Sequence, residues 1–126
     1  MGSKKILIAE DSSVIQNITR KVLQFQNYEI ETAKDGLQVL EAMAMEDFDA
    51  ILMDINMPKM DGMECAKKIR AMSDPKKSKI PIIAITGNAR NYTSSDFAAV
   101  GINDYMQKPV NFDDLVEKLS SYLEKK

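Results

Sequence analysis

Residues 48–62 read FDAILMDINMPKMDG, and this stretch decides the fold that the sequence predicts. Ala50 to Met53 form a short apolar run, which is typical of a strand buried on both faces of a parallel sheet. The run ends abruptly on Asp54, and residues typical of loops follow it: Asn56, Pro58, Asp61 and Gly62. Open α/β sheets bind ligands at the carboxyl ends of their strands. Asp54 is therefore a candidate functional residue, although taken alone it could simply begin a turn.

Four further segments complete a set of five predicted strands. Two of them contain apolar runs, Ile6–Ala9 and the IIAI of Ile80–Ile85, and a third, Ile102–Met106, is a short final strand. The fourth, Tyr28–Ala33, alternates weakly between apolar and polar residues and ends without a functional group, so we expect it at the edge of the sheet.

Amphipathic segments separate these strands and predict about five helices. The sequence also predicts a polar loop of solvated lysines at Ser73–Lys79, a weaker helix at Tyr92–Val100 stopped by Gly101, and a cap at Asn111 for the last helix. The apolar stripes of the other helices are Ile15, Ile18, Val22 and Phe25; Leu37, Leu40 and Ala44; Cys65, Ile69 and Met72; and Phe112, Leu115, Val116, Leu119 and Leu123. Helical crossovers between strands imply one α/β domain, a parallel sheet with helices on both faces.

Composition excludes several classes of function. The chain has 126 residues, enough for one domain, and a net charge of -2 gives no electrostatic case for nucleic acid or an anionic membrane surface. No apolar run approaches the ~20 residues of a membrane span, and we expect no signal peptide. The single cysteine, Cys65, fits a reducing, cytoplasmic compartment and is expected to be a buried structural thiol. Because histidine is absent, any chemistry must rest on carboxylates, hydroxyls, lysines and backbone.

The predicted strand ends carry a set of groups that belongs together. They bring Glu10 and Asp11, then Asp54, then Thr86, then Lys108 to one edge of the sheet. Taken singly, each residue could be a helix cap, a turn residue or a solvated charge. The convergence of an acidic cluster, a hydroxyl and a lysine on one edge of the sheet is, however, hard to explain by chance. Three close carboxylates would repel one another unless a cation neutralised them, and hard oxygen ligands suit Mg²⁺. A hydroxyl and a lysine suit a phosphoryl group, and a carboxylate can be a covalent nucleophile.

The whole chain resembles the response-regulator receiver domains (CheY-like) of two-component signalling, over residues 4–124. The resemblance is carried by Glu10-Asp11 after the first strand, Asp54 with MPKMDG behind it, Thr86 after the fourth, and Lys108-Pro109 after the fifth. It implies a doubly wound (βα)5 fold with a five-stranded parallel sheet in the order 2-1-3-4-5.

The same resemblance implies roles for particular residues. Asp54 would accept the phosphoryl group, and Glu10, Asp11, Asp54 and the carbonyl of Asn56 would bind Mg²⁺. Lys108 would pair with the phosphoryl oxygens, and its bond to Pro109 would be cis. Two residues would form the switch after transfer: Thr86 and Tyr105.

The resemblance also implies the partners. The phosphoryl donor would be a phosphohistidine of a histidine kinase or a histidine phosphotransfer protein, and a changed surface would bind an unknown downstream protein. Such a domain catalyses its own phosphorylation and dephosphorylation without being a conventional turnover enzyme. We expect a cytoplasmic monomer or weak dimer. No output segment follows the last helix, so the chain is expected to act as a stand-alone receiver or as part of a larger hybrid protein.

Two features depart from the family pattern. Thr86 is followed by Gly87-Asn88-Ala89, where many members have alanine directly after the hydroxyl residue. The positions that tune hydrolysis of the aspartyl phosphate are Asn56 and Asn88, and neither side chain can act as a general base. The sequence therefore predicts ordinary self-dephosphorylation.

Three other functions share the fold or the chemistry. A flavin mononucleotide electron carrier would need a phosphate-binding loop after the first strand, where this chain has EDSS. An aspartyl phosphatase or phosphomutase often has a second acid two residues after the nucleophile, where this chain has Asn56. A degenerate receiver would serve only for docking, yet every chemical position is filled.

Overall fold

The computed structural model describes residues 4–87 and 92–123. Within them, five strands form one sheet in the order β2-β1-β3-β4-β5, and every neighbouring pair is parallel. The predicted fold class and strand order are confirmed. The strands are β1 (Lys5–Ala9), β2 (Glu29–Ala33), β3 (Ala50–Asp54), β4 (Ile82–Thr86) and β5 (Asp104–Gln107). The helices are α1 (Ser13–Phe25), α2 (Gly36–Met45), α3 (Gly62–Arg70), α4 (Pro75–Ser78), α5 (Ser94–Ala99) and α6 (Phe112–Leu123).

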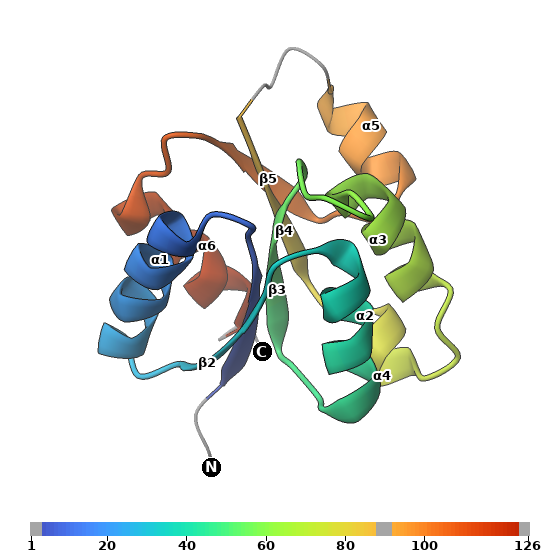
Figure 1. Ribbon diagram of the computed structural model, residues 1–126, viewed down its shortest axis with the longest axis horizontal. Coiled ribbons are helices and arrows are strands. Elements are labelled where there is room, and N and C mark those ends of the chain that lie inside the picture. The colour runs from blue at the N-terminus through green and yellow to red at the C-terminus, as the bar shows by residue number, and fades with distance from the viewer. Residues whose placement is uncertain (1–3, 88–91, 124–126) are drawn as a thin grey trace.

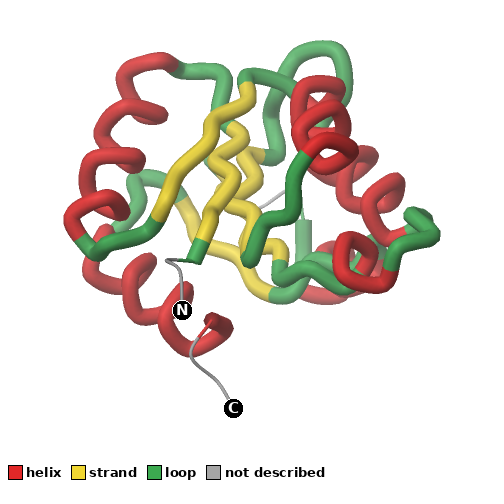
Figure 2. Tube along the Cα trace, turned by 90° about the horizontal axis from the view of Figure 1, so that it is seen from below, coloured by secondary structure: helices red, strands yellow, loops and turns green. Residues whose placement is uncertain are grey.

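The helices cover both faces of the sheet, as Figures 1 and 2 show. On one face, α1 and α6 pack on alternate strand residues such as Ile6, Ile8 and Leu52. On the other face, α2, α3 and α5 pack on the residues between them, such as Leu7 and Ile51. Because β3 and β4 are buried on both faces, their sequences are continuous apolar runs.

β2 is an edge strand, as predicted, because among the described strands it pairs with β1 alone. Its register places Glu29 beside Lys5 and Glu31 beside Leu7. Both glutamates are exposed to solvent, whereas Ala33 at the end of the strand is buried. The outer edge of the sheet on this side therefore carries acidic side chains.

The apolar stripe predicted on the first helix does not form the buried face of α1. Ile15, Ile18 and Phe25 are 37%, 46% and 85% exposed, and the buried residues are Gln16, Thr19 and Leu23. The reason is that hydrogen bonds satisfy the two polar residues, so they can lie against the sheet. The Thr19 hydroxyl donates to the carbonyl of Ile15, and the Gln16 amide donates to two backbone carbonyls.

The predicted face of the second helix is also rotated. Leu37 is 45% exposed and Ala44 lies on the surface, whereas α2 buries Gly36, Val39 and Met43. On α3 the prediction is confirmed for Cys65 and Ile69, and on α6 for Leu115, Leu119 and Leu123.

The segment predicted as a polar loop, Ser73–Lys79, contains the one-turn helix α4. Asp74 caps it, with its side chain accepting a hydrogen bond from the N–H of Lys76. Lys77 is not a solvated lysine, because its ammonium donates to the carbonyls of Met43 and Glu46 at the end of α2. A cation at a helix C-terminus is favoured by the helix dipole. Across residues 4–87 and 92–123, no helix is long and apolar enough to cross a membrane.

Candidate functional site

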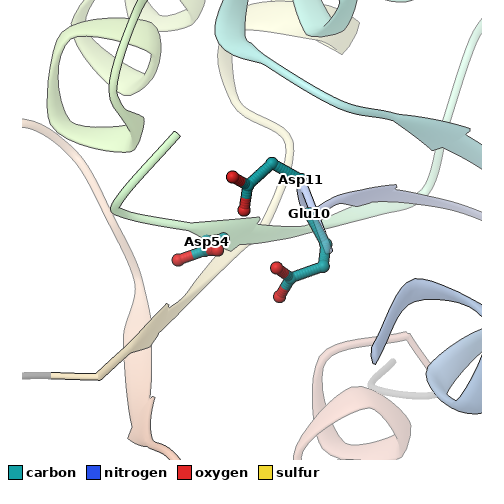
Figure 3. A group of neighbouring side chains, drawn as sticks. All are labelled: Glu10, Asp11 and Asp54. Carbon is teal, nitrogen blue, oxygen red and sulfur yellow. The ribbon is translucent and has the colours of Figure 1, made fainter. Parts of the chain in front are cut away.

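Three carboxylates gather where β1 and β3 end (Figure 3). Ala9 pairs with Met53 in the sheet, so Glu10 and Asp54 are the next residues on adjacent parallel strands. Glu10, Asp11 and Asp54 each offer an oxygen, and these oxygens lie within 4.8 Å of one another. The structure therefore brings together the acidic residues that the sequence placed at the strand ends.

The three carboxylates differ in their access to solvent. Asp54 is 2% exposed and Glu10 5%, whereas Asp11 lies on the surface. Asp11 thus forms the rim of the site, and the other two form its floor.

Lys108 reaches the same site from the end of β5. Its Nζ lies 3.2 Å from Asp54 Oδ2 and 3.4 Å from Glu10 Oε1. Its backbone N–H donates to the carbonyl of Thr86 at 2.8 Å, and the peptide bond to Pro109 is cis, as the resemblance implied. Burial opposes the positive charge, but the carboxylates of Asp54 and Glu10 outweigh it and raise the pKa of Lys108. Lys108 is a stable cation in this setting.

The electrostatics of Glu10 show how crowded the negative charge is. Burial is the largest cause that raises the pKa of the Glu10 carboxyl, to about 7, and the neighbouring Asp54 adds to the rise. The N–H of Ser12, which donates to Glu10 Oε2 at 3.1 Å, and the charge of Lys108 act in the opposite direction. Cations are the natural partners of such a cluster.

Backbone contacts hold Asp54 in place. The N–H of Asn56 donates to Asp54 Oδ1 at 3.1 Å, whereas the Asn56 side chain is exposed. The N–H of Gly62, at the start of α3, donates to the carbonyl of Ile55 at 2.9 Å. A Cβ at position 62 would lie 2.7 Å from the carbonyl oxygen of Asp54, so glycine allows α3 to begin directly on this backbone.

Thr86 and Tyr105 lie on β4 and β5, the next two strands of the sheet after β3. Thr86 ends β4 and is completely buried. Tyr105 lies on β5, is 38% exposed, and stacks on Phe97 of α5 with ring centroids 4.8 Å apart. Asn88 and Ala89, which the sequence singled out, lie outside the described residues.

Gln16 supports the site, although its place in the sequence does not mark it as a functional residue. This α1 residue is buried, and its Nε2 donates to the carbonyls of Glu10 at 3.0 Å and Ala33 at 3.2 Å. The only signal in the sequence was a polar residue next to apolar residues of a helix. Exposed helix positions show the same pattern, so this signal does not distinguish a buried glutamine.

The residues present can hold a hard divalent cation. Three carboxylates provide oxygen ligands only, and two of them are buried beside a lysine. Ions such as Mg²⁺ prefer oxygen ligands and need only one or two carboxylates when phosphate oxygens and water complete the shell. The acidic cluster therefore fits a metal, and the lysine beside it fits an anion.

Comparison with known proteins identifies the family. The family model described as "Response regulator receiver domain" matches residues 6–120. The chain therefore belongs to the response-regulator receiver domains of two-component signalling.

The curated relatives combine such a domain with other segments. Over 120 residues the chain is 35% identical to the CAI-1 autoinducer sensor kinase/phosphatase CqsS of Vibrio cholerae, covering 95% of this chain and 17% of that protein. It is 32% identical to the response regulator MprA of Mycobacterium ulcerans, covering 96% of this chain and 50% of that protein. The chain thus spans at most about half the length of these two relatives.

Solved structures agree with the fold. One is the receiver domain of the sensor histidine kinase PA1611 from Pseudomonas aeruginosa PAO1, which has a magnesium ion coordinated in its active site cleft. It is 31% identical, with a TM-score of 0.89, and the match covers 98% of this chain and 100% of that one. The chemotaxis protein CheY4 of Vibrio cholerae is 33% identical with the same TM-score, over 97% of this chain and all of that one.

Proposed function

We propose that Asp54 accepts a phosphoryl group from a phosphohistidine of a partner protein, in a reaction that requires Mg²⁺. The observation that carries this proposal is the position of Asp54, which lies at the floor of an acidic cluster with the Lys108 ammonium 3.2 Å away. A carboxylate oxygen of Asp54 forms the new O–P bond as the P–N bond to the donor imidazole breaks. The electron pair of that bond returns to the imidazole nitrogen.

The residues of the site have different roles in phosphoryl transfer. Mg²⁺ would be held by Glu10, Asp11, Asp54 and the carbonyl of Asn56, and it would supply positive charge to the phosphoryl oxygens. Lys108 supplies a second cation to the same oxygens. The N–H of Asn56 orients the Asp54 carboxylate through its hydrogen bond to Oδ1.

The phosphorylated site then changes the surface above β4 and β5. Phosphorylation adds about -1.5 to -2 charges, and the Thr86 hydroxyl turns to donate to the new oxygens. Tyr105 follows it inward and gives up its present stack on Phe97. The surface around α5 and β5 thereby changes its affinity for a downstream protein.

A protein donor is favoured by the surface beside Lys108. An apolar groove of about 430 Å³ lies there, lined by Ile15, Ile18, Lys108, Pro109, Val110 and Phe112. Acetyl phosphate is too small to need such a surface, whereas a protein that brings a histidine to Asp54 has apolar side chains that can pack in the groove. The groove and the exposed stripe of α1 therefore support a histidine kinase or histidine phosphotransfer protein as the partner.

Intact-protein mass spectrometry tests the acceptor. The parent protein and Asp54→Asn are incubated with acetyl phosphate and Mg²⁺, with and without EDTA. We expect one phosphoryl adduct on the parent, its loss with EDTA, and no adduct on the variant. If neither acetyl phosphate nor a panel of phosphorylated histidine proteins modifies the parent, the domain serves only for docking.

A second variant tests the donor surface. Ile18→Lys places a charge in the groove without touching Asp54, and Lys67→Glu changes a charge on α3 as the control. We expect Ile18→Lys to slow transfer from a phosphorylated histidine protein and to leave acetyl phosphate labelling unchanged. Equal transfer rates for both variants would place the donor elsewhere.

A further inference from the structure

We infer that Gln16 is a positioning residue for the metal site. Its amide holds the peptide that links Glu10 to Asp11. The inference rests on the proposed function, because it concerns residues proposed to bind Mg²⁺. It adds a residue of α1 that touches neither the metal ligands' carboxylates nor the phosphoryl acceptor.

In the described sheet, no backbone N–H group of β2 donates a hydrogen bond to the carbonyl of Glu10. β1 ends at Ala9, and the last contact between the two strands is the N–H of Glu10 donating to the carbonyl of Ala33 at 2.9 Å. The next carbonyl along the chain, that of Glu10, accepts instead from Nε2 of Gln16 at 3.0 Å. The Gln16 side chain thus continues the hydrogen-bonding of the sheet one step past its end.

That carbonyl has a special position in the site. It belongs to the peptide group that joins Glu10 to Asp11, and a peptide group is planar. Fixing its oxygen therefore fixes the orientation of the plane from which both carboxylate residues project. The position of the buried Glu10 carboxylate relative to the exposed Asp11 carboxylate depends on this orientation.

The same amide also anchors the edge strand. Nε2 of Gln16 donates to the carbonyl of Ala33 at 3.2 Å, and that carbonyl accepts the N–H of Glu10 as well. Gln16 is only 9% exposed, so water competes little for these contacts. A buried side chain that bridges the ends of β1 and β2 restricts movement of the Glu10 backbone relative to the sheet.

Thr19 provides a matched control one turn along the same helix. It is buried to a similar extent, at 8% exposed, and its hydroxyl donates to the carbonyl of Ile15 within α1. Thr19→Val therefore removes a hydrogen bond from the buried face of α1 but none of the hydrogen bonds to residue 10. Gln16→Met keeps the length of the side chain and removes both donated bonds.

The experiment is a calorimetric titration of metal-free protein with MgCl₂, together with a thermal melt of each variant. We expect Gln16→Met to weaken Mg²⁺ binding by about tenfold and Thr19→Val to leave the Kd unchanged, even if both lower the Tm. Gln16→Asn keeps the amide on a side chain too short to reach both carbonyls, so its Kd should lie between those of the parent and Gln16→Met.

Two results would overturn the inference. One is an equal Kd for the parent, Gln16→Met and Gln16→Asn, which would make Gln16 a structural residue only. The other is a parent protein that binds no Mg²⁺, which would remove the proposed metal dependence as well. The first result leaves phosphoryl acceptance by Asp54 untouched, so the two failures are distinguishable.

Discussion

Lys108 Nζ lies 3.2 Å from Asp54 Oδ2, although β4 separates β3, which ends on Asp54, from β5, which Lys108 follows. The lysine side chain therefore spans the end of β4, where its own N–H is fixed to the carbonyl of Thr86. One cation thus connects three neighbouring strands at the edge where the carboxylates meet.

Replacing this lysine should separate metal binding from phosphoryl transfer. Lys108→Met removes a positive charge beside Asp54 and Glu10, so Mg²⁺ should bind more tightly, on the order of tenfold. The same change removes a cation from the transferring phosphoryl group, so labelling by acetyl phosphate should slow by on the order of 10²-fold. Calorimetry with MgCl₂ and timed mass spectrometry measure the two effects. Weaker Mg²⁺ binding by the variant would contradict the assigned role, and Lys118→Met, on α6, is the control.

Glu10→Gln should stabilise the metal-free protein. The Glu10 carboxyl is buried near Asp54, and its raised pKa of about 7 means that the ionised form is disfavoured in the folded state. At pH 8 that ionised form predominates, so a neutral amide should raise the Tm by a few degrees, about 4 °C per kcal/mol in a domain of this size. Thermal melts with EDTA and with MgCl₂ test this, because the variant should also lose the stabilisation that Mg²⁺ gives the parent. A lower Tm than the parent in EDTA would argue against charge crowding in the site.

Two glycines should respond oppositely to alanine. Gly101 has a φ of +85°, and a Cβ there would lie 2.6 Å from Cγ of Arg70, whose guanidinium donates to the carbonyl of residue 101. Among the residues that the structure describes, a Cβ on Gly87 would meet only Cδ of Lys108, at 3.8 Å. Urea unfolding should show Gly101→Ala destabilised by more than ~1 kcal/mol, and Gly87→Ala unchanged or stabilised by up to ~1 kcal/mol. A destabilised Gly87→Ala would mean that the loop after β4 needs the freedom of glycine.

Cys65 should react with thiol reagents only when the protein opens. The thiol is completely buried between α2 and α3, and burial raises its pKa to about 12. Because the thiolate is the reactive form, an aromatic disulfide reagent at pH 8 should label the folded protein at the rate of unfolding. The same reagent in urea gives the rate for the exposed thiol. Rapid labelling without urea would show that α2 and α3 separate in the native state.

The strands could be predicted because each buried strand leaves an apolar run, and a parallel sheet brings the run ends to one edge. Their order came from the resemblance to receiver domains and not from the pattern of the strands. The helix faces could not be predicted as well. Apolar spacing on α1 identified an apolar side, but Ile15 and Ile18 line a groove while hydrogen-bonded Gln16 and Thr19 face the sheet. The partners of such polar residues are backbone carbonyls brought close by the fold, and no local pattern records them.

The candidate site divides in the same way. The identity of Glu10, Asp11, Asp54 and Lys108 followed from their places at strand ends, because side chains there need only the topology to meet. The hydrogen bonds that hold these residues in place could not be predicted from the positions of the strand ends. The bonds from Gln16 and from the N–H of Asn56 depend on the final direction of single peptide groups.

The acidic outer edge of β2 has a consequence for how copies of this domain meet one another. An unpaired strand offers N–H and carbonyl groups that a second chain could use to extend the sheet. Here Glu29 and Glu31 are exposed along that strand, so two copies placed edge to edge would set like charges against each other. Crowded solutions of the protein should therefore resist growth of continuous sheets from this side, and this resistance should weaken when salt screens the glutamates.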